Sequence, residues 1–276
     1  MTSDRPGDAW RAAAIAPPLV KLGRDGGIVD AFLVPWDSEV FGFPVAEIRR
    51  FELAEGQDGR GALEPFDAWC QIAGVKLASC RLDHARLRES MAVEDGGFRF
   101  IEMVHVPRFD LGRPVDRPTT RLQISEAGTE DLPRLEAIAA DAFTTGRFRL
   151  DWRLPPELGD RRYASWVRTS LDSPTQTVLK AELDGTLIGF FIVERREDGV
   201  TYWHLTAIAP EFQGRGLGLS LWQTMLDRAR VSGSHAVETT ISGHNSAALS
   251  LYSRLGFRFT SAQMTFHRLS EEPARS

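Results

Sequence analysis

The sequence predicts an α+β fold with a mostly antiparallel central sheet flanked by helices, preceded by a smaller α/β domain. Three consecutive runs rich in β-branched and aromatic residues predict strands, at residues 177–183, 187–195 and 200–208. The turns between them, Asp184-Gly185 and Asp198-Gly199, are of the type that closes tight hairpins, so these strands should pair antiparallel. Segment 130–142 repeats apolar residues three and four positions apart, which predicts a helix packed on this sheet.

The other elements of the second half alternate between strand and helix. Strands are expected at 122–125, 237–241 and 257–267, and helices at about 161–171, 217–231 and 246–255. Asn245 precedes the last helix as an N-cap, and Gly256 ends it. Residues 143–159 are expected to form a loop.

The first half of the chain is predicted to form a separate domain. Strands are expected at 28–34, 45–48, 76–81 and 97–109, helices at 66–73 and 87–93, and a compact aromatic segment at 36–45. Prolines and glycines indicate a loose segment at 1–27 and a linker at 110–118. We therefore expect an N-terminal domain at 28–112, a second domain at 119–270 and a short tail at 271–276.

The composition argues against several classes of function. The formal net charge of −5 is unlike the basic footprint of a nucleic-acid-binding protein. Cys70 and Cys80 are the only cysteines, too few for a cysteine-rich metal site or a disulfide scaffold, and we expect no metal. No apolar run approaches the length of a membrane span, and the N-terminus lacks a signal-peptide pattern. We expect a soluble cytoplasmic protein with no nucleic-acid or membrane partner.

The most informative stretch is Gln213-Gly214-Arg215-Gly216-Leu217-Gly218, which follows a strand and leads into a helix. Its glycines let the backbone approach a ligand closely, because no Cβ stands in the way. The first helical turn has unsatisfied N–H groups and a partial positive charge, which favour a phosphate group. The spacing is neither a dinucleotide fingerprint nor a P-loop. A tight strand-to-helix turn without a ligand is the alternative.

Together with the segment that follows, this loop resembles the GNAT N-acetyltransferase superfamily. Residues 213–218 fit the pyrophosphate motif of that family, and Asn245, Ala248, Tyr252 and Leu255-Gly256-Phe257 fit its second acyl-CoA motif in the same order. The resemblance covers about residues 119–269. It implies a GNAT fold, a catalytic role for the second domain, acetyl-CoA or another acyl-CoA as donor, and an amine as acceptor.

The resemblance also implies roles for individual residues. The cofactor-binding residues would be Ala207, Ile208, Gln213, Gly214, Arg215, Gly216, Leu217, Gly218, Asn245, Ala248 and Tyr252. Strand 200–208 would part from the next strand and offer backbone groups to the donor. Tyr252 is the expected general acid for the leaving thiolate, with simple packing between helix and sheet as the alternative.

A general base is harder to assign. His204 has a suitable ordinary pKa, and strand alternation would put it on one face with Tyr202, Thr206 and Ile208. Glu194 is a further candidate for the base, and water is another. A structural role for a single strand histidine is the alternative.

A short internal repeat suggests that the two halves of the chain arose by duplication. Gly97-Phe98-Arg99-Phe100 recurs as Gly256-Phe257-Arg258-Phe259, each after a strand and a helix and before a strand. The first half is therefore expected to be a degenerate GNAT-like half. It lacks a Gln-x-x-Gly-x-Gly loop, and Val93 falls where Tyr252 lies in the second half, so it should not bind CoA.

The acceptor side resembles a two-domain branch of the family, the one that acetylates TDP-linked fucosamine. The resemblance rests on residues 142–152, 162–166 and 36–42. Candidate substrate-binding residues are Arg147, Phe148, Arg149, Trp36 and Asp37. An extended loop would turn both arginines to one side, where their paired donors suit a diphosphate, and the aromatic rings could stack on a base or sugar. For Asp37, a surface charge is the alternative.

The expected function is N-acetyl transfer to the amine of a small molecule, in the first place a nucleotide-linked amino sugar. Acylation of another small amine, with CoA or a carrier-protein thioester as donor, is the second reading. A noncatalytic acyl-CoA sensor is the third. A homodimer is one of the assemblies that the sequence allows for this chain.

Overall fold

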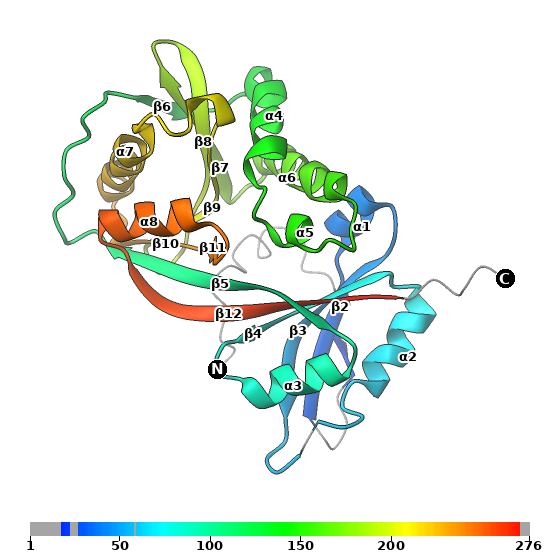
Figure 1. The fold of residues 1–276 in the computed structure, drawn as a ribbon. Helices are drawn as coiled ribbons and strands as arrows, with labels where there is room; N and C mark the ends of the chain where they lie inside the picture. The colour runs from blue at the N-terminus through cyan, green and yellow to red at the C-terminus, as the bar shows by residue number, and fades with distance from the viewer. Residues whose placement is uncertain (1–17, 23–26, 58, 271–276) are drawn as a thin grey trace. The chain divides into compact units, whose positions relative to one another are not determined.

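The computed structural model describes residues 18–22, 27–57 and 59–270 (Figure 1). The tail expected at 271–276 lies outside these residues, as does most of the loose segment expected at 1–27. Within that segment, Val20–Lys21 form a strand and Gly27 begins another. The described chain forms two compact units, and each is treated by itself. The second-half unit comprises residues 105–260, and the first-half unit comprises residues 18–104 with 261–270. The division falls at residues 104–105 and 260–261 rather than at the expected boundary of 112–119. It passes through the long strands β5 (Arg99–Asp110) and β12 (Arg258–Leu269), each of which contributes residues to both units.

The second-half unit is built on a mixed sheet with the strand order β5-β10-β9-β8-β7-β6. Its strands are β5 (Arg99–Asp110), β6 (Gln123–Glu126), β7 (Gln176–Leu183), β8 (Thr186–Arg195), β9 (Val200–Ile208) and β10 (Ala236–Thr239), and β11 (Ile241–Ser242) also pairs with β5. Strands β6 to β9 are antiparallel, whereas β10 runs parallel to β9. The hairpins at Asp184-Gly185 and Asp198-Gly199 join β7 to β8 and β8 to β9, as predicted.

Helices cover both faces of this sheet (Figure 1). They are η2 (Thr129–Asp131), α4 (Leu132–Ala142), α5 (Arg147–Leu150), α6 (Pro156–Leu171), η3 (Pro210–Phe212), α7 (Leu217–Val231) and α8 (Ser246–Leu255). One hydrophobic core lies between the sheet and the helices α7 and α8, and a second lies between the sheet and the helices α4 and α6. The fold is therefore the α+β arrangement that the sequence predicts.

Residues 143–159 are not the continuous loop expected. Arg147–Leu150 form the short helix α5, and α6 begins at Pro156, five residues before the predicted start. Proline is favoured in the first turn of a helix because its missing N–H would have no partner there, which explains why α6 begins at Pro156.

The first-half unit has the strand order β1-β2-β3-β4-β12. Its strands are β1 (Val20–Lys21), β2 (Gly27–Leu33), β3 (Val45–Leu53), β4 (Leu77–Asp83) and the later part of β12 (Arg258–Leu269). Its helices are α1 (Pro35–Phe41), α2 (Glu64–Ala73) and α3 (Leu87–Asp95), and a separate core includes Ile48, Phe66 and Phe98.

The two halves of the chain repeat one topology. The series β3-α2-β4-α3-β5 matches β9-α7-β10-α8-β12, and each series ends in a strand of 12 residues. In each, the first and second strands pair parallel over four positions, ending at Ile48–Cys80 and at Trp203–Thr239. A β-bulge follows at once in the first strand, at Arg49 and at His204. This correspondence supports the duplication suggested by the repeated Gly-Phe-Arg-Phe segment.

The repeat extends to the loop before the second element, a feature that the sequence reasoning missed. Gly59-Arg60-Gly61 precedes α2 as Gly214-Arg215-Gly216 precedes α7. All four glycines have positive φ angles, 83° and 70° in the first triplet and 73° and 78° in the second. The Gly-Arg-Gly triplet in each half is the sequence feature that could have predicted this part of the repeat.

Candidate acyl-transfer site

The candidate site begins where β9 and β10 part. Their parallel ladder ends at the pair Trp203–Thr239, while β9 continues to Ile208. Ala209 N donates to Ile188 O of β8 at 2.8 Å, which fixes the alternation of the backbone groups along this part of β9. Residues Thr206 and Ile208 therefore turn their N–H and C=O groups toward the open edge.

Ala207 does not offer its backbone groups to that edge. By the same alternation they point toward β8, and Ala207 O would lie 2.4 Å from a Cβ built on Gly189. The expectation that Ala207 binds the donor through its backbone is therefore wrong, whereas Ile208 lies as expected. Thr206, which belongs to the strand expected to offer backbone groups to the donor, also turns its backbone groups toward the open edge.

The glycine loop follows β9 as predicted. Gly214 and Gly216 adopt left-handed conformations with φ of 73° and 78°, and Gly216 is the N-cap of α7. A Cβ on either glycine would meet open space, whereas one on Gly218 would lie 3.5 Å from Leu251 and 3.8 Å from Ile208. At Gly214 and Gly216 no side chain therefore covers the backbone of the loop. The missing side chain at Gly218 lets α7 approach α8 and β9 closely.

Gln213 plays a structural part in this loop. Its side-chain amide donates to Ile208 O at 2.9 Å, and its backbone N–H donates to Pro210 O at 3.2 Å. The backbone donors that remain for a phosphate group therefore begin at Gly214, one residue later than expected. Arg215 is exposed, with its guanidinium carbon 5.2 Å from the ring centre of Phe212.

Helix α8 brings the second motif to the same place. Asn245 caps it, because its Oδ1 accepts a hydrogen bond from Ala248 N at 3.0 Å. Ala248 packs against the same core as Ile208.

Tyr252 lies within the core on that side of the sheet. Its ring contacts Trp203, Trp222 and Phe257, with centroid separations of 6.4, 6.2 and 4.7 Å. Burial raises the pKa of Tyr252 to about 12, against smaller opposing effects of its polar neighbours Trp222, Thr206 and Thr239. The phenol is therefore protonated throughout the physiological range and can act as a proton or hydrogen-bond donor.

His204 lies on the opposite face of β9. The ladder pairs Ile192 with Leu205 and Val193 with Trp203, so His204 is the extra residue of a β-bulge. Its Nε2 lies 2.8 Å from Oε2 of Glu194, and its ring meets those of Tyr202 and Trp166 edge to face. Burial lowers the pKa of His204, which the carboxylate of Glu194 partly offsets.

The bulge corrects the expected arrangement of the strand. Trp203 and Ile208 contact the core beneath α7 and α8, whereas Leu205 and Ala207 belong to the core beneath α4 and α6. His204 therefore shares a face with Tyr202 but not with Thr206 or Ile208. The extra residue reverses the alternation, and a sequence pattern of period two cannot register it.

The expected acceptor residues are not gathered as predicted. Arg147, Phe148 and Arg149 belong to helix α5, where residues two apart point to nearly opposite sides. The expectation that both arginines face one side of an extended loop is therefore wrong. Arg147 lies 4.5 Å from the centre of the buried Phe148 ring, and Arg149 pairs with Asp160 at 3.2 Å.

Trp36 and Asp37 belong to α1 of the first-half unit. Asp37 is only 1% exposed, which excludes the surface-charge reading. Trp36 is half-buried, and its ring centre lies 6.5 Å from that of Phe32.

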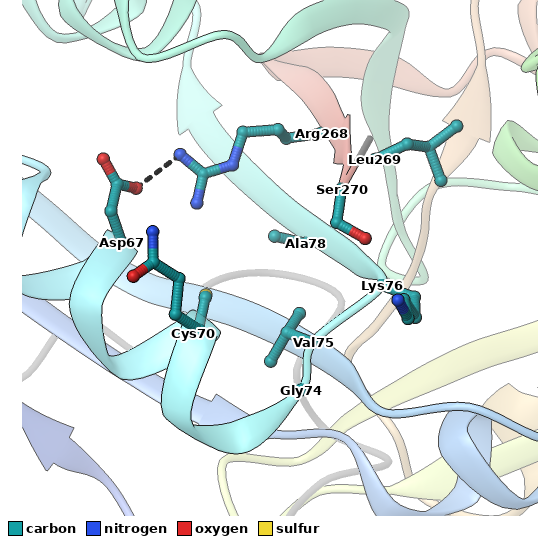
Figure 2. Close-up of a pocket in the computed structure, with 10 residues that line it drawn as sticks. Asp67, Cys70, Gly74, Val75, Lys76, Ala78, Arg268, Leu269 and Ser270 are labelled. Carbon is teal, nitrogen blue, oxygen red and sulfur yellow. Dashed lines mark hydrogen bonds and ion pairs between the residues drawn. The ribbon is translucent and has the colours of Figure 1, made fainter. Parts of the chain in front are cut away.

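A pocket of about 400 Å³ lies in the first-half unit beside α2, the start of β4 and the end of β12 (Figure 2). Arg268 pairs across it with Asp67 at 2.5 Å. Burial raises the pKa of the Cys70 thiol to about 11, so this thiol is not a nucleophile near neutral pH. None of the site residues expected from the sequence lines this pocket.

Within residues 18–270, apart from the gaps at 23–26 and 58, no helix has the length and apolar character needed to cross a membrane.

Comparison with known proteins identifies the family of this chain. The model of the acetyltransferase (GNAT) family matches residues 134–257. L-2,4-diaminobutyric acid acetyltransferase of Nocardia farcinica is 35% identical over 156 residues, which are 55% of this chain and 76% of that protein. The dTDP-fucosamine acetyltransferase of Escherichia coli O6:H1 is 28% identical over 64% of this chain and 75% of its own length.

Solved structures show the same fold. A GCN5-related N-acetyltransferase from Kribbella flavida matches with a TM-score of 0.63, 14% identity and coverage of 96% of each chain. The family match falls on the strands, glycine loop and helices that form the candidate site. The chain belongs to the GNAT family of N-acetyltransferases.

Proposed function

We propose that this enzyme transfers an acetyl group from acetyl-CoA to the primary amine of an anionic small molecule, in the first place a nucleotide-linked amino sugar. The observation that carries the proposal is the opening between β9 and β10. It is bordered by the bare glycine loop, the free edge of β9 and the protonated Tyr252.

The opening suits a CoA thioester at three places. The N–H groups from Gly214 onward and the N-terminus of α7 favour the pyrophosphate, since they combine free donors with a partial positive charge. The edge of β9 at Thr206 and Ile208 offers backbone groups to an extended amide chain. One of their N–H groups would polarise the thioester carbonyl. Bound acetyl-CoA would supply the activated acetyl group and a thiolate leaving group.

Tyr252 is the proposed donor to the leaving sulfur. A phenol with a pKa of about 12 gives up its proton to a thiolate only uphill, since an ordinary thiol has a pKa of about 8.5. Its stronger contribution is a hydrogen bond that stabilises negative charge as it develops on sulfur, in a site sheltered from water. The thiolate leaves hydrogen-bonded to the phenol as the C–S bond breaks, and Tyr252 keeps its proton.

The acceptor class is inferred from the relatives. The names of two relatives specify diaminobutyric acid and dTDP-fucosamine, each an amine that also carries an anionic group. The segment from α5 to α6 has arginines at positions 147, 149, 153, 161, 162 and 168, of which Arg149, Arg153 and Arg168 pair with Asp160, Asp151 and Glu136. The anionic character of the acceptor is therefore supported by the names of the relatives. A small amino acid is the second candidate, favoured by the 35% identity to the diaminobutyrate enzyme.

A thiol-release assay tests the proposal. Purified enzyme and acetyl-CoA are mixed with a panel of TDP- and UDP-linked amino sugars, and separately with diamino acids and simple amines. Release with a nucleotide amino sugar supports the first acceptor class, and release only with amino acids supports the second. Binding of acetyl-CoA without release for any amine contradicts the proposal and favours a carrier-protein donor or a sensing role.

A further inference from the structure

The pocket of the first-half unit has the size of a small-molecule site. Its volume of about 400 Å³ lies within the usual range of ligand pockets. It is bordered by α2, the turn that follows α2, the start of β4 and the end of β12 (Figure 2). None of the described residues that line it falls within 134–257, the segment matched by the acetyltransferase family. The pocket is therefore separate in sequence from the proposed acyl-transfer site.

The charged groups of the pocket do not balance. Of the described residues that line it, Lys76 and Arg268 carry a positive charge and Asp67 carries a negative one. The Cys70 thiol adds no charge near neutral pH, because burial raises its pKa to about 11. Two positive charges against one negative charge leave an excess that favours an anionic ligand. An ion pair that only fastened α2 to β12 would explain Asp67 and Arg268 but not this excess.

Arg268 is held firmly at the wall of the pocket. Its Nη1 donates to Oδ1 of Asp67 at 2.5 Å and to the carbonyl of Gly96 at 3.0 Å. Its guanidinium carbon lies 5.2 Å from the ring centre of Phe66 and 4.8 Å from that of Phe98. These contacts fix the guanidinium before a ligand arrives, so little side-chain freedom is lost on binding.

The other donors of Arg268 are available to a ligand. Both of its hydrogen bonds to described residues come from Nη1, and Figure 2 shows the second terminal nitrogen turned toward Cys70. Nε and Nη2 form one side of the guanidinium fork, whose two parallel N–H groups match the two oxygens of a carboxylate. The Lys76 ammonium and the Ser270 hydroxyl add further donors to the wall.

We infer that this pocket binds a small carboxylate with a short aliphatic body. The carboxylate accepts two hydrogen bonds from Nε and Nη2 of Arg268, and its charge balances the excess positive charge. The aliphatic body contacts the apolar part of the wall, which Val75, Ala78 and Leu269 provide (Figure 2). An inorganic anion would use the charged contacts alone, so the apolar wall selects an anion that carries a hydrocarbon chain.

Butyrate is a suitable probe for this site. Titrated into the methyl-labelled enzyme, it should shift the NMR signals of Val75, Ala78 and Leu269 with a Kd of about 1 mM, an ordinary value for a ligand of about six non-hydrogen atoms. Butanol and butylammonium keep the chain without the carboxylate and should leave these signals in place. Inorganic phosphate lacks the chain and should bind about tenfold more weakly.

Two substitutions test the donors. Arg268→Lys keeps the charge but loses the fork, and it should raise the Kd for butyrate about tenfold or more. Lys76→Gln, at an exposed position that leaves Arg268 in place, should raise it about threefold. Lys21→Gln removes the same charge from an exposed position on β1 and is the matched control, with no expected change. If Arg268→Lys fails to fold, the Lys76→Gln titration decides.

Three results would overturn the inference. They are the absence of any shift at the three methyl-bearing residues, equal binding of phosphate and butyrate, and a Kd that Lys76→Gln changes no more than Lys21→Gln does. The titration uses neither acetyl-CoA nor an amine, so its outcome is independent of the proposed function.

Discussion

The hydroxyl of Thr239 donates a 2.7 Å hydrogen bond to the backbone carbonyl of Trp203, at the last paired position of β9 and β10. Both residues are buried. The bond fixes the point at which the two strands part, and therefore the place where the proposed donor site begins.

Replacing Thr239 by valine should loosen this point. The Trp203 carbonyl would lose a partner, which should lower the free energy of unfolding by about 1 kcal/mol. The Kd for acetyl-CoA should rise about tenfold by calorimetry, the equivalent of about 1.4 kcal/mol. Thr201→Val, which removes the 2.7 Å contact with Ser234 near the other end of the ladder, is the control. Equal effects of the two variants on Kd would contradict the special role of Thr239.

Replacing Tyr252 by phenylalanine tests the donor role of the phenol. Because the ring and its packing are kept, the Kd for acetyl-CoA should be unchanged, whereas kcat should fall about a hundredfold. Tyr163→Phe is a suitable control, since Tyr163 stacks on Phe143 at 4.6 Å on the far side of the sheet. An unchanged kcat in Tyr252→Phe would show that the residue only packs.

Replacing Gly216 by alanine separates backbone strain from ligand binding. Gly216 and Gly185 both have φ of 78°, and a Cβ on either meets open space within the protein. Each substitution should cost about 1 kcal/mol of stability. Only the Gly216 variant should also weaken acetyl-CoA binding, by about tenfold or more, because its Cβ would obstruct the phosphate. If Gly185→Ala weakens binding equally, the loop is not the phosphate site.

The buried His204 should make stability depend on pH. Its pKa in the folded protein is below the ordinary value of 6.5, so between the two values the unfolded chain binds more protons. The contribution is therefore fully present above pH 6.5 and is lost as the pH falls toward the lower, folded pKa. Urea unfolding at several pH values should give a shallower slope for His204→Gln than for the wild type. Parallel curves would contradict the buried neutral imidazole.

The chain should bind one acetyl-CoA. In the first half, Arg88 donates from α3 to the carbonyls of Ala54 and Gln57, across the region that corresponds to the open groove of the second half. A Cβ on Gly59 would lie 2.5 Å from Ala92, whereas its counterpart Gly214 meets open space. Calorimetry should therefore give a stoichiometry of one, with all binding weakened in Gly216→Ala. A second equivalent bound in that variant would show that the first half is also a site.

Much of the fold was open to prediction because its signals are local. The hairpins follow from Asp-Gly pairs whose backbone preference matches a tight turn, and the Asn245 cap follows from a side chain that bonds three residues ahead. The glycine loop is of the same kind, since positive φ at Gly214 and Gly216 requires glycine for reasons within those residues.

The remaining features depend on contacts between distant parts of the chain. The bulge at His204, the end of the ladder at Thr239 and the burial of Tyr252 depend on strands and helices distant in sequence. One inserted residue reverses which side chains share a face, and only pairing with β8 reveals it. Local sequence patterns were thus enough to predict the family and its two motifs, one of which is the glycine loop. Pairing and packing determined which face each side chain occupies, because these contacts join residues that no local pattern connects.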